Sequence, residues 1–248
     1  MADNKSDIWL WDVPAAFVLL TRLPLPPLPD HAFAHGARAV WAYPLVGLVL
    51  GGIVAVLSLV LSGLGLPAML AAGLVLAALV MLTGAMHEDG LADTGDGLWG
   101  GQTPARRLDI MKDSRIGTYG VLALVLSTGL RWLGYAEVSV AELVAALVLS
   151  RAAMPALMAA LPHARTDGLS RSVGRPGMGP VAIALGLAAL IGIGLTGGGA
   201  VVALLVGTGA ALLMALLARA KIGGQTGDIL GATQIMVEIA VLITFIAL

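Results

Sequence analysis

The sequence predicts an all-α integral membrane protein, a polytopic bundle of about seven transmembrane helices with one further helix at the membrane interface near the N-terminus. Composition is the first observation, because 58% of the 248 residues are hydrophobic and only 12% are charged, with a mean hydropathy of +0.95. An ordinary globular domain is far less apolar. The second observation is that apolar runs of about 20 residues recur, each able to cross a hydrocarbon core of about 30 Å as a helix. No internal repeat or linker divides the chain, so we expect a single domain over residues 1–248.

The predicted elements follow the hydropathy of the chain in order. Residues 8–20 are apolar but short, and Trp9 and Trp11 beside Asp12 suit the membrane interface. Residues 21–29 (TRLPLPPLP) cannot be helical, because proline lacks an amide N–H and biases the preceding residue away from the helical region. The seven predicted spans are the long apolar runs that follow, residues 39–61, 67–86, 117–135, 140–161, 179–196, 198–218 and 230–248.

Lysine and arginine occur only in every second loop of this topology. The loops near residues 62–66, 136–139 and 197 contain neither. The N-terminal segment and the three other loops carry the basic residues outside the spans: Lys5, Arg22, Arg38, Arg106, Arg107, Lys112, Arg115, Arg165, Arg171, Arg175, Arg219 and Lys221. The positive-inside rule places these loops in the cytoplasm. We therefore expect one composite site, built from three polar loops on the cytoplasmic face.

Composition also limits the partners. A net charge of −1 argues against a nucleic-acid partner. The absence of cysteine excludes iron–sulfur and thiolate zinc sites. Abundant glycine, 33 residues, permits close helix packing in a bilayer. The oligomeric state is left open, a homo-oligomer included.

One polar stretch, residues 87–119, interrupts the apolar sequence and holds six of the 15 acidic residues. If the helix of the second span continues into it, Asp89, Asp93 and Asp96 stand at i, i+4 and i+7 and share one face. Neighbouring carboxylates repel one another unless a cation neutralises them, and oxygen ligands suit Mg²⁺ or Mn²⁺. The triad therefore predicts a metal site. The alternative is a solvated acidic helix end without a metal.

Glycines and basic residues accompany these acids. Gly90, Gly95 and Gly97 are expected to leave room for a phosphate ligand near the backbone. The third span begins nearby, and a helix N-terminus attracts phosphate. The candidate phosphate contacts are Arg107, Lys112, Ser114, Arg115 and Gly117. Acids for a metal beside bases for phosphate indicate phosphoryl transfer. The alternative is that the bases only set the topology and pair with Asp109 and Asp113.

Two further polar segments belong to the same predicted face. Residues 221–231 (KIGGQTGDILG) include Asp228, a candidate fourth metal ligand whose alternative role is an ordinary helix N-cap. The loop of residues 163–179 is either a substrate lid or a plain basic loop. Together these segments offer four candidate substrate contacts, Arg171, Arg175, Gln225 and Thr226.

Other ionisable residues are more ambiguous. His87 precedes the first acid and is a candidate catalytic base or a group that orients a carboxylate, with a structural histidine as the alternative. Arg131, Arg151 and Glu238 fall within predicted spans, where charge is costly and usually paired. We expect an interhelical ion pair that involves Glu238.

Four motifs together make the sequence resemble the cobalamin synthase family, the adenosylcobinamide-GDP ribazoletransferases. They are LTRLPLP (residues 20–26), HEDGLADTGDG (87–97), DIMKDSRIGTYGVLAL (109–124) and GGQTGD (223–228). The resemblance covers essentially the whole chain in order and spacing, and the long motifs within residues 87–124 are highly specific.

The resemblance implies a reaction, its partners and its location. The cobinamide phosphate of adenosylcobinamide-GDP would pass to a ribose hydroxyl of α-ribazole or its 5′-phosphate, with release of GMP, in a divalent-metal-dependent step at the bacterial inner membrane, within the lipid bilayer. Carried over by position, Asp89, Asp93 and Asp96 correspond to the acidic metal-binding cluster, with Asp228 as an addition. Glu88 stands where the family motif is open, so no essential role is assigned to it.

The residues suit this chemistry independently of the family. A metal ion on the diphosphate stabilises the departing GMP while a carboxylate accepts the proton of the attacking hydroxyl. We expect Asp96 or Asp89 to be that base, with Lys112 and Arg115 on phosphate oxygens.

Three other functions compete. CDP-alcohol phosphotransferases use similar acidic clusters, but here Asp93 and Asp96 come sooner and the arginine of that motif is missing. Membrane prenyltransferases carry several acids on each of two helices, whereas the second site here offers only Asp228. A transporter could use Arg151 and Glu238 for coupling, but it would favour broken, repeated halves, and the sequence shows no repeat.

Overall fold

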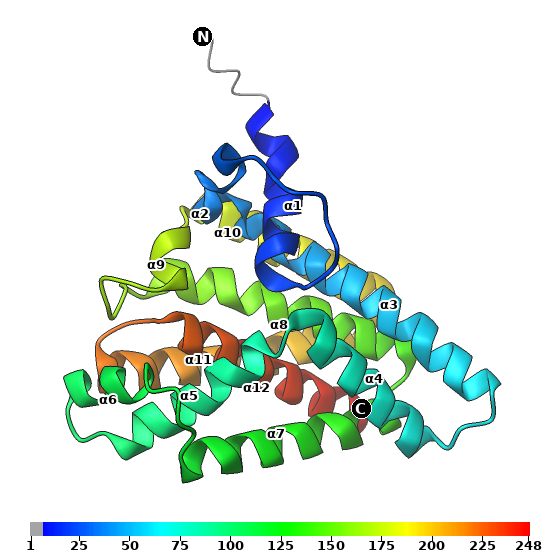
Figure 1. Ribbon diagram of the computed structural model, residues 1–248. Helices are drawn as coiled ribbons and strands as arrows, with labels where there is room; N and C mark the ends of the chain where they lie inside the picture. Colours follow the sequence, from blue (N-terminus) through cyan, green and yellow to red (C-terminus); the bar gives the residue numbers. More distant parts are fainter. Residues whose placement is uncertain (1–6) are drawn as a thin grey trace.

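The computed structural model describes residues 7–248, whose regular elements are all helical (Figure 1). The long helices are α3 (Tyr43–Gly63), α4 (Ala68–Thr83), α5 (Met86–Gly100), α7 (Thr118–Glu137), α8 (Val140–Ala160), α10 (Met178–Thr196), α11 (Gly199–Ile222) and α12 (Gly227–Ala247). The shorter ones are α1 (Asp7–Leu20), η1 (Asp30–Phe33), α2 (Gly36–Ala39), η2 (Val40–Ala42), α6 (Pro104–Ile110) and α9 (Leu169–Val173). The predicted all-α membrane bundle is confirmed.

Each of the seven predicted spans forms a helix. Five helices among residues 7–248 are long and apolar enough to cross a membrane, or six if the bent pair α4 and α5 counts as one span. Helix α7 is not among them, because Arg131 and several polar and small residues lower its hydropathy. Its outer face nevertheless exposes an apolar stripe, made of Leu122, Val125, Leu126, Leu130 and Leu133. The buried charge of α7, Arg131, thus lies on the side that faces the bundle.

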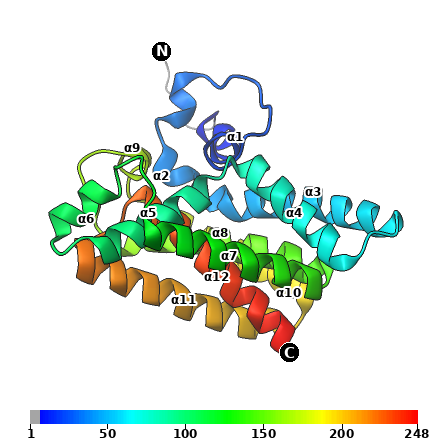
Figure 2. The same cartoon turned by 60° about the horizontal axis from the view of Figure 1, so that its bottom comes forward.

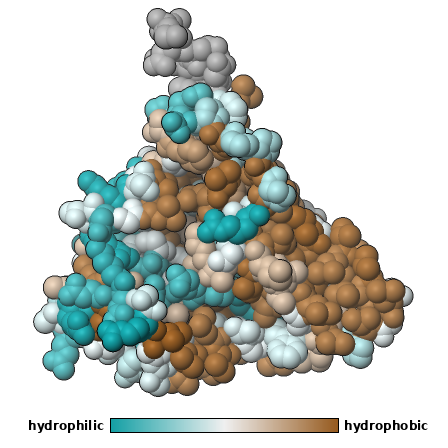
Figure 3. Space-filling model, in the orientation of Figure 1, coloured by the Kyte–Doolittle hydropathy of each residue, from teal (hydrophilic) through white to brown (hydrophobic). Residues whose placement is uncertain are grey.

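Helix α8 lies at the centre of the bundle, packed between α3, α10 and α12. Most of its residues are buried, as are most of those of α12. Figure 2 shows α1 seated on one side of the bundle. The outer helices expose large apolar side chains such as Leu190 on α10 and Leu205 on α11. Figure 3 shows polar residues gathered on the side where α6 and α9 lie, and apolar residues where α3 meets α4.

The N-terminal region is attached to the bundle by a buried carboxylate. Asp12, predicted to lie near the interface, is only 2% exposed. It accepts hydrogen bonds from Arg38 Nε and Nη2 and from Trp41 Nε1, the last at 2.9 Å. The predicted helix of residues 8–20 and the non-helical stretch of residues 21–29 are both confirmed. Lys5 and the side chain of Trp9 lie outside the described parts of the chain.

The second predicted span does not continue into the acidic stretch as one helix. It ends as α4, and α5 starts in a new direction, bent by 88°. Gly84 adopts φ 64° and Ala85 φ 55° at the break, and left-handed backbone of this kind stops a helix. The expectation of a continuous helix was therefore wrong. The acids still share one face because α5 contains all three of them.

Helix α5 approaches its neighbours closely through glycine. A Cβ on Gly90 would lie 2.9 Å from the carbonyl oxygen of Asp228, and one on Gly231 would lie 3.2 Å from Cα of His87. Gly95 faces the backbone of Tyr119, and Gly97 faces Met111. The expectation that these α5 glycines leave room for phosphate was wrong, because protein atoms fill the space. Their role is helix packing, as small residues commonly serve in membrane bundles.

Buried charge connects α5, α7 and α12. Arg131 on α7 contacts Glu88 of α5 at 2.6 Å and Glu238 of α12 at 2.7 Å. Glu238 also accepts hydrogen bonds from Tyr135 and, at 2.8 Å, from Gln234. The predicted ion pair of Glu238 is thus confirmed. Glu88, to which no essential role was assigned from the sequence, is a second partner of Arg131. Three helices around the acids are held together by one cation.

Arg151 is the other buried cation of the bundle. Its side chain is 1% exposed, donates from Nη1 to the carbonyl oxygen of Leu147 at 2.9 Å, and leaves Nε without a partner among the described residues.

Replacing Arg131 by methionine leaves Glu88 and Glu238 buried without their cation. Removing one partner of a buried ion pair costs about 3–5 kcal/mol, so we expect the thermal unfolding midpoint in detergent to fall by roughly 10 °C. Asp113→Asn is the matched control, because it breaks the exposed pair of Arg115 and Asp113 and should leave the midpoint unchanged. An unaltered midpoint in Arg131→Met would contradict a structural role for the network.

Candidate active site

The three polar loops meet on one side of the bundle, as predicted. Arg107 of α6 donates to the carbonyl oxygen of Lys221 at 2.9 Å, and Lys221 donates to that of Leu98 at 3.1 Å. Lys112, after α6, forms an ion pair of 2.6 Å with Asp167, which precedes α9. Loops that are far apart in the sequence therefore form one surface beside α5 and α6.

The loop before α9 and the linker before α12 are joined through their backbones. Gln225 N donates to the carbonyl oxygen of Pro162 at 2.8 Å, and Ala164 N donates to that of Gln225 at 2.9 Å. A Cβ on Gly224 would collide with the carbonyl oxygen of Pro162, so only glycine permits this approach. The linker GGQTGD is thereby fixed against α8.

The four predicted acidic ligands have different surroundings. Asp89 is exposed and Asp93 half-buried, and neither carboxylate has a hydrogen-bond or ion-pair partner within residues 7–248. Asp96 accepts from the backbone N–H of Gly117 at 2.6 Å and of Gly120 at 2.9 Å. Asp228 forms an ion pair with Arg165. Two of the four acids are thus available to bind a ligand and two already have partners.

Asp96 anchors the start of α7. Both of its oxygens accept N–H groups of the first turn, where a carboxylate also meets the positive end of the helix dipole. Gly117 and Gly120 are required there, because a Cβ at either position would collide with the Asp96 carboxylate. Asp228 lies close enough to Asp93 for their charges to repel one another, and Arg165 offsets that repulsion.

The acids do not by themselves form a complete metal site. Within residues 7–248, no three His, Asp or Glu side chains are grouped so that they could hold a metal ion. Asp89 and Asp93 remain a pair of oxygen donors one turn apart on the same face of α5. Their oxygen atoms suit Mg²⁺, which commonly takes one or two carboxylates together with phosphate oxygens of a substrate.

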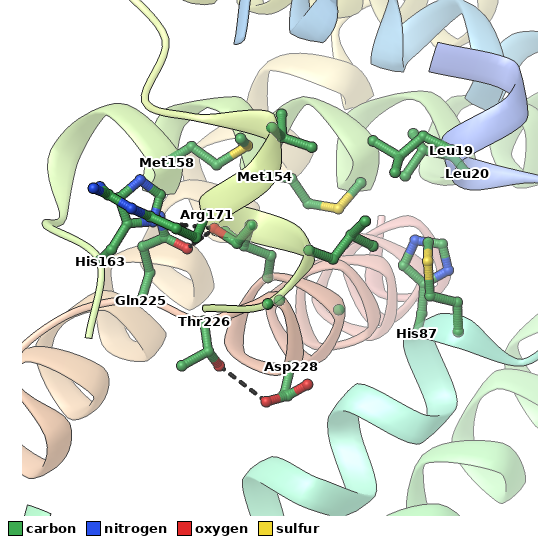
Figure 4. Close-up of a pocket in the computed structure, with 18 of the residues that line it drawn as sticks. Leu19, Leu20, His87, Met154, Met158, His163, Arg171, Gln225, Thr226 and Asp228 are labelled. Carbon is green, nitrogen blue, oxygen red and sulfur yellow. Dashed lines mark hydrogen bonds between the residues drawn. The ribbon is translucent and has the colours of Figure 1, made fainter. Parts of the chain in front are cut away.

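Two cavities open beside the acidic helix. The first, which we term the apolar cavity, has a volume of about 280 Å³ and lies between α5, α8, α9 and α12 (Figure 4). Its walls include Leu19, Leu20, Met154, Met158 and Leu230, with polar groups at His87, His163, Ser170, Arg171, Gln225, Thr226 and Asp228. In Figure 4, His87 and the pair of His163 and Gln225 lie at opposite ends of the cavity.

The second, which we term the charged cavity, has a volume of about 530 Å³ and lies between α5 and the loop that joins α6 to α7. Its polar walls are Glu88, Asp89, Asp93, Lys112, Asp113, Ser114 and Arg115. Asp89 is the single described residue that lines both cavities. The exposed acid of α5 therefore stands at their junction.

Most of the predicted substrate contacts line one of the cavities. Lys112, Ser114 and Arg115 line the charged cavity, and Arg171, Gln225 and Thr226 line the apolar one. The other three line neither of these two cavities and contact other parts of the protein. Arg107 donates to α11, Gly117 donates to Asp96, and Arg175 donates to the carbonyl oxygen of Ala159 at 2.9 Å at the end of α8.

Hydrogen bonds organise the polar end of the apolar cavity. Ser170 Oγ donates to Gln225 Oε1 at 2.5 Å, and Gln225 Nε2 lies 2.9 Å from His163 Nδ1. An amide N–H only donates, so Nδ1 is the acceptor. Thr226 caps α12 by accepting from Ile229 N, and its hydroxyl donates to Asp228 at 3.2 Å. Gln225 and Thr226 are thus held in fixed orientations.

Charged neighbours shift several titrations in the loops. The hydrogen bond from Arg115 lowers the pKa of Asp113 to about 2. The hydrogen bond from Lys112 lowers the pKa of Asp167. Burial, followed by the charges of Arg171 and Arg175, lowers the pKa of His163. At neutral pH the loops therefore carry two ionised carboxylates and a neutral imidazole.

Sequence reasoning missed three groups that the structure brings to the site. Arg165 is the cation beside Asp228, Ser170 orients Gln225, and Glu88 anchors Arg131. Only the role of Glu88 could have been predicted from the sequence. Arg131 lies inside a predicted span and requires an acidic partner, and Glu88 is one of few candidates. The other two contacts depend on the fold of the loop before α9.

Comparison with known proteins places this site in a family. The family described as cobalamin-5-phosphate synthase matches residues 12–246. A protein of Bradyrhizobium diazoefficiens named adenosylcobinamide-GDP ribazoletransferase is 48% identical over 238 residues, covering 94% of this chain and 92% of its own. Relatives with the same name from Mesorhizobium japonicum and Brucella canis are 44% and 43% identical, covering 94% and 90% of this chain and 91% and 92% of their own.

No solved structure is similar to this chain. The match in sequence extends over nearly the whole chain and includes α5, both cavities and all three polar loops. The protein accordingly belongs to the cobalamin-5-phosphate synthase family, whose members are enzymes of cobalamin synthesis.

Proposed function

We propose that this protein transfers the cobinamide phosphate of adenosylcobinamide-GDP to a ribose hydroxyl of α-ribazole or its 5′-phosphate and releases GMP. The observation that carries the proposal is the position of Asp89, a carboxylate without a partner within residues 7–248, at the junction of a charged and an apolar cavity. A reaction that joins two substrates requires two sites that meet at the reacting atoms. The names of the relatives support the same reaction.

The reaction breaks one phosphorus–oxygen bond and forms another. The ribose hydroxyl oxygen attacks the phosphorus atom that carries cobinamide, and the bond from that phosphorus to the oxygen bridging it to GMP breaks. GMP leaves with the bridging oxygen. The hydroxyl proton passes to a carboxylate, for which Asp89 is best placed because it lines both cavities.

The charged cavity suits the diphosphate. Lys112, Ser114 and Arg115 supply positive charge and a hydroxyl donor to phosphate oxygens. Asp93 on the same wall would hold Mg²⁺ jointly with those oxygens, and the ion would offset negative charge on the leaving GMP. Asp96 and Asp228 then serve to position α7 and Arg165, because their oxygens already have partners.

We also propose that this chemistry takes place on the cytoplasmic face of a bacterial inner membrane. The basic residues of the chain concentrate in the loops that form the site, and positively charged loops remain on the cytoplasmic side. A nucleotide-linked substrate is also supplied from that side.

The direct test is release of GMP by purified protein given adenosylcobinamide-GDP and α-ribazole, with and without Mg²⁺. We expect release that requires both substrates and the ion. Folded protein that releases no GMP under any of these conditions would rule the reaction out, and CDP-alcohols would be tried next.

Asp89→Asn removes the proposed base and keeps the shape of the side chain. Loss of a general base lowers rates by about 10²–10⁴-fold, so we expect kcat for GMP release to fall at least about 100-fold with an unchanged unfolding midpoint. Glu137→Gln is the control, because Glu137 is an exposed acid at the far end of α7. Wild-type kcat in Asp89→Asn would contradict the assignment.

Asp93→Asn tests the proposed metal ligand. Substitutions in the residues that surround a metal ion weaken metal affinity by about 10–100-fold. The variant should therefore need correspondingly more Mg²⁺ to reach its half-maximal rate. Mg²⁺-dependent binding of GDP, measured by calorimetry without turnover, should weaken in parallel. If the Mg²⁺ requirement is unaltered in both assays, Asp93 does not hold the ion.

His163 predicts a pH dependence. The pKa of His163 is lowered in the folded protein, so on acidification the unfolded chain takes up the proton before the folded protein does. The contribution of His163 to folding stability is therefore complete above the unfolded pKa of about 6.5. It is lost as pH falls, when protonation breaks the hydrogen bond from Gln225. One hydrogen bond is worth about 1 kcal/mol, which corresponds to roughly 2–4 °C in this size class.

The measurement is the unfolding midpoint at pH 7 and pH 5 for wild type and His163→Asn. Asparagine retains an acceptor and does not titrate, so the variant should show the smaller decrease. Equal decreases in the two proteins would show that His163 does not contribute.

A further inference from the structure

The apolar cavity is lined in part by buried apolar side chains. Leu20, Met154, Met158 and Leu230 line it and are each less than 8% exposed. Methionine is flexible and packs well against aromatic ring faces. A guanine edge, with several donors and acceptors, would find few polar partners on these side chains. The walls therefore suit a flat and weakly polar ring.

Size limits the occupant further. Small-molecule sites commonly enclose about 300–1,000 Å³, and this cavity, at about 280 Å³, is at the lower end of that range. A nucleoside is of suitable size, whereas a corrinoid ring is too large and must remain outside. Of the two proposed substrates, the acceptor is thus the one that could enter as a whole.

One buried polar atom beside the cavity has no partner among the described residues. His87 is 2% exposed and lines the cavity, and its Nε2 has no hydrogen-bond partner within residues 7–248. Buried polar atoms are almost always paired, so an unpaired one on a side chain that lines a cavity points to a ligand atom. A benzimidazole nucleoside has one ring nitrogen outside its glycosidic bond, and that nitrogen can accept from an imidazole N–H.

The opposite end of the cavity suits a ribose and its phosphate. Thr226 and the ordered amide of Gln225 are hydrogen-bonding groups near Asp228. Arg171 stands at the mouth, exposed, and forms no ion pair within residues 7–248. A guanidinium in this position can bind a phosphate monoester. Asp89 lies where this cavity meets the charged one.

We propose that the apolar cavity is the acceptor site of the enzyme. It holds the benzimidazole-type base of α-ribazole against Met154 and Met158, with His87 Nε2 donating to the free ring nitrogen. The ribose then lies toward Asp89 and the 5′-phosphate, when present, at Arg171. This assignment rests on the proposed function. It makes His87 a residue that recognises the acceptor base through a hydrogen bond.

The experiment is calorimetric binding of α-ribazole and, separately, of GMP to purified protein. Met158→Trp fills the cavity from a buried wall, and Leu169→Trp fills it from a side chain that is 52% exposed and tolerates change. Met81→Trp is the matched control, because Met81 is 77% exposed on α4 and lines neither cavity. Both cavity variants should weaken α-ribazole at least about 10-fold and change GMP binding less than about twofold, with no effect of Met81→Trp.

Other outcomes overturn the proposal. Loss of GMP binding with intact α-ribazole binding would assign the cavity to guanosine. Unchanged binding of both ligands in folded Leu169→Trp would show that the cavity is not a substrate site. Release of GMP by the wild type is measured in parallel. If the wild type releases GMP but the cavity variants bind α-ribazole normally, only this proposal is contradicted. If the cavity variants weaken α-ribazole binding but the wild type releases no GMP, only the proposed reaction is contradicted.

Arg171→Ala tests the placement of the phosphate. It should weaken α-ribazole 5′-phosphate about 10-fold and leave free α-ribazole within about twofold, because the charged hydrogen bond exists only with the monoester. An equal loss for both ligands, or none for either, would overturn the position of the phosphate at the mouth of the cavity.

Discussion

The buried ion pairs of Arg131 are the interaction on which the site depends. They hold α5 against α7 and α12 through Glu88 and Glu238, at the level where glycine already allows α5 and α12 to approach within backbone contact. Glu88 is the neighbour of Asp89 in the chain, so whatever fixes Glu88 also fixes the acid at the junction of the two cavities. A charge inside the bundle thus determines the geometry of a polar site at its edge.

The acidic residues of the site differ in their hydrogen-bond and ion-pair partners, and we assign their roles accordingly. Asp96 anchors the first turn of α7, and Asp228 holds Arg165 near the linker before α12. Asp89 and Asp93 keep their oxygens free on the same helix face. We therefore propose that Asp89 and Asp93, completed by substrate phosphate, hold the metal ion, because the oxygens of Asp96 and Asp228 already accept hydrogen bonds.

Hydropathy predicted the fold well because a bilayer imposes long helices, and loop charges predicted which loops would meet. The break before α5 was missed because it depends on left-handed backbone at Ala85, which has no sequence signature. The carbonyl groups that Arg107 and Arg175 bind could not be predicted, because they become neighbours of these side chains only in the fold. That Nε2 of His87 lacks a partner among the described residues likewise becomes apparent only in the folded chain.

The central claim is that two substrates meet at Asp89, one from each cavity. A cryo-electron microscopy structure of the protein with Mg²⁺, α-ribazole and a non-reactive analogue of adenosylcobinamide-GDP tests it most directly. The account predicts the base of α-ribazole between Met158 and His87, the diphosphate beside Lys112 and Asp93, and the attacking hydroxyl within hydrogen-bond distance of Asp89. Density for both ligands in one cavity, or a hydroxyl remote from Asp89, would contradict it.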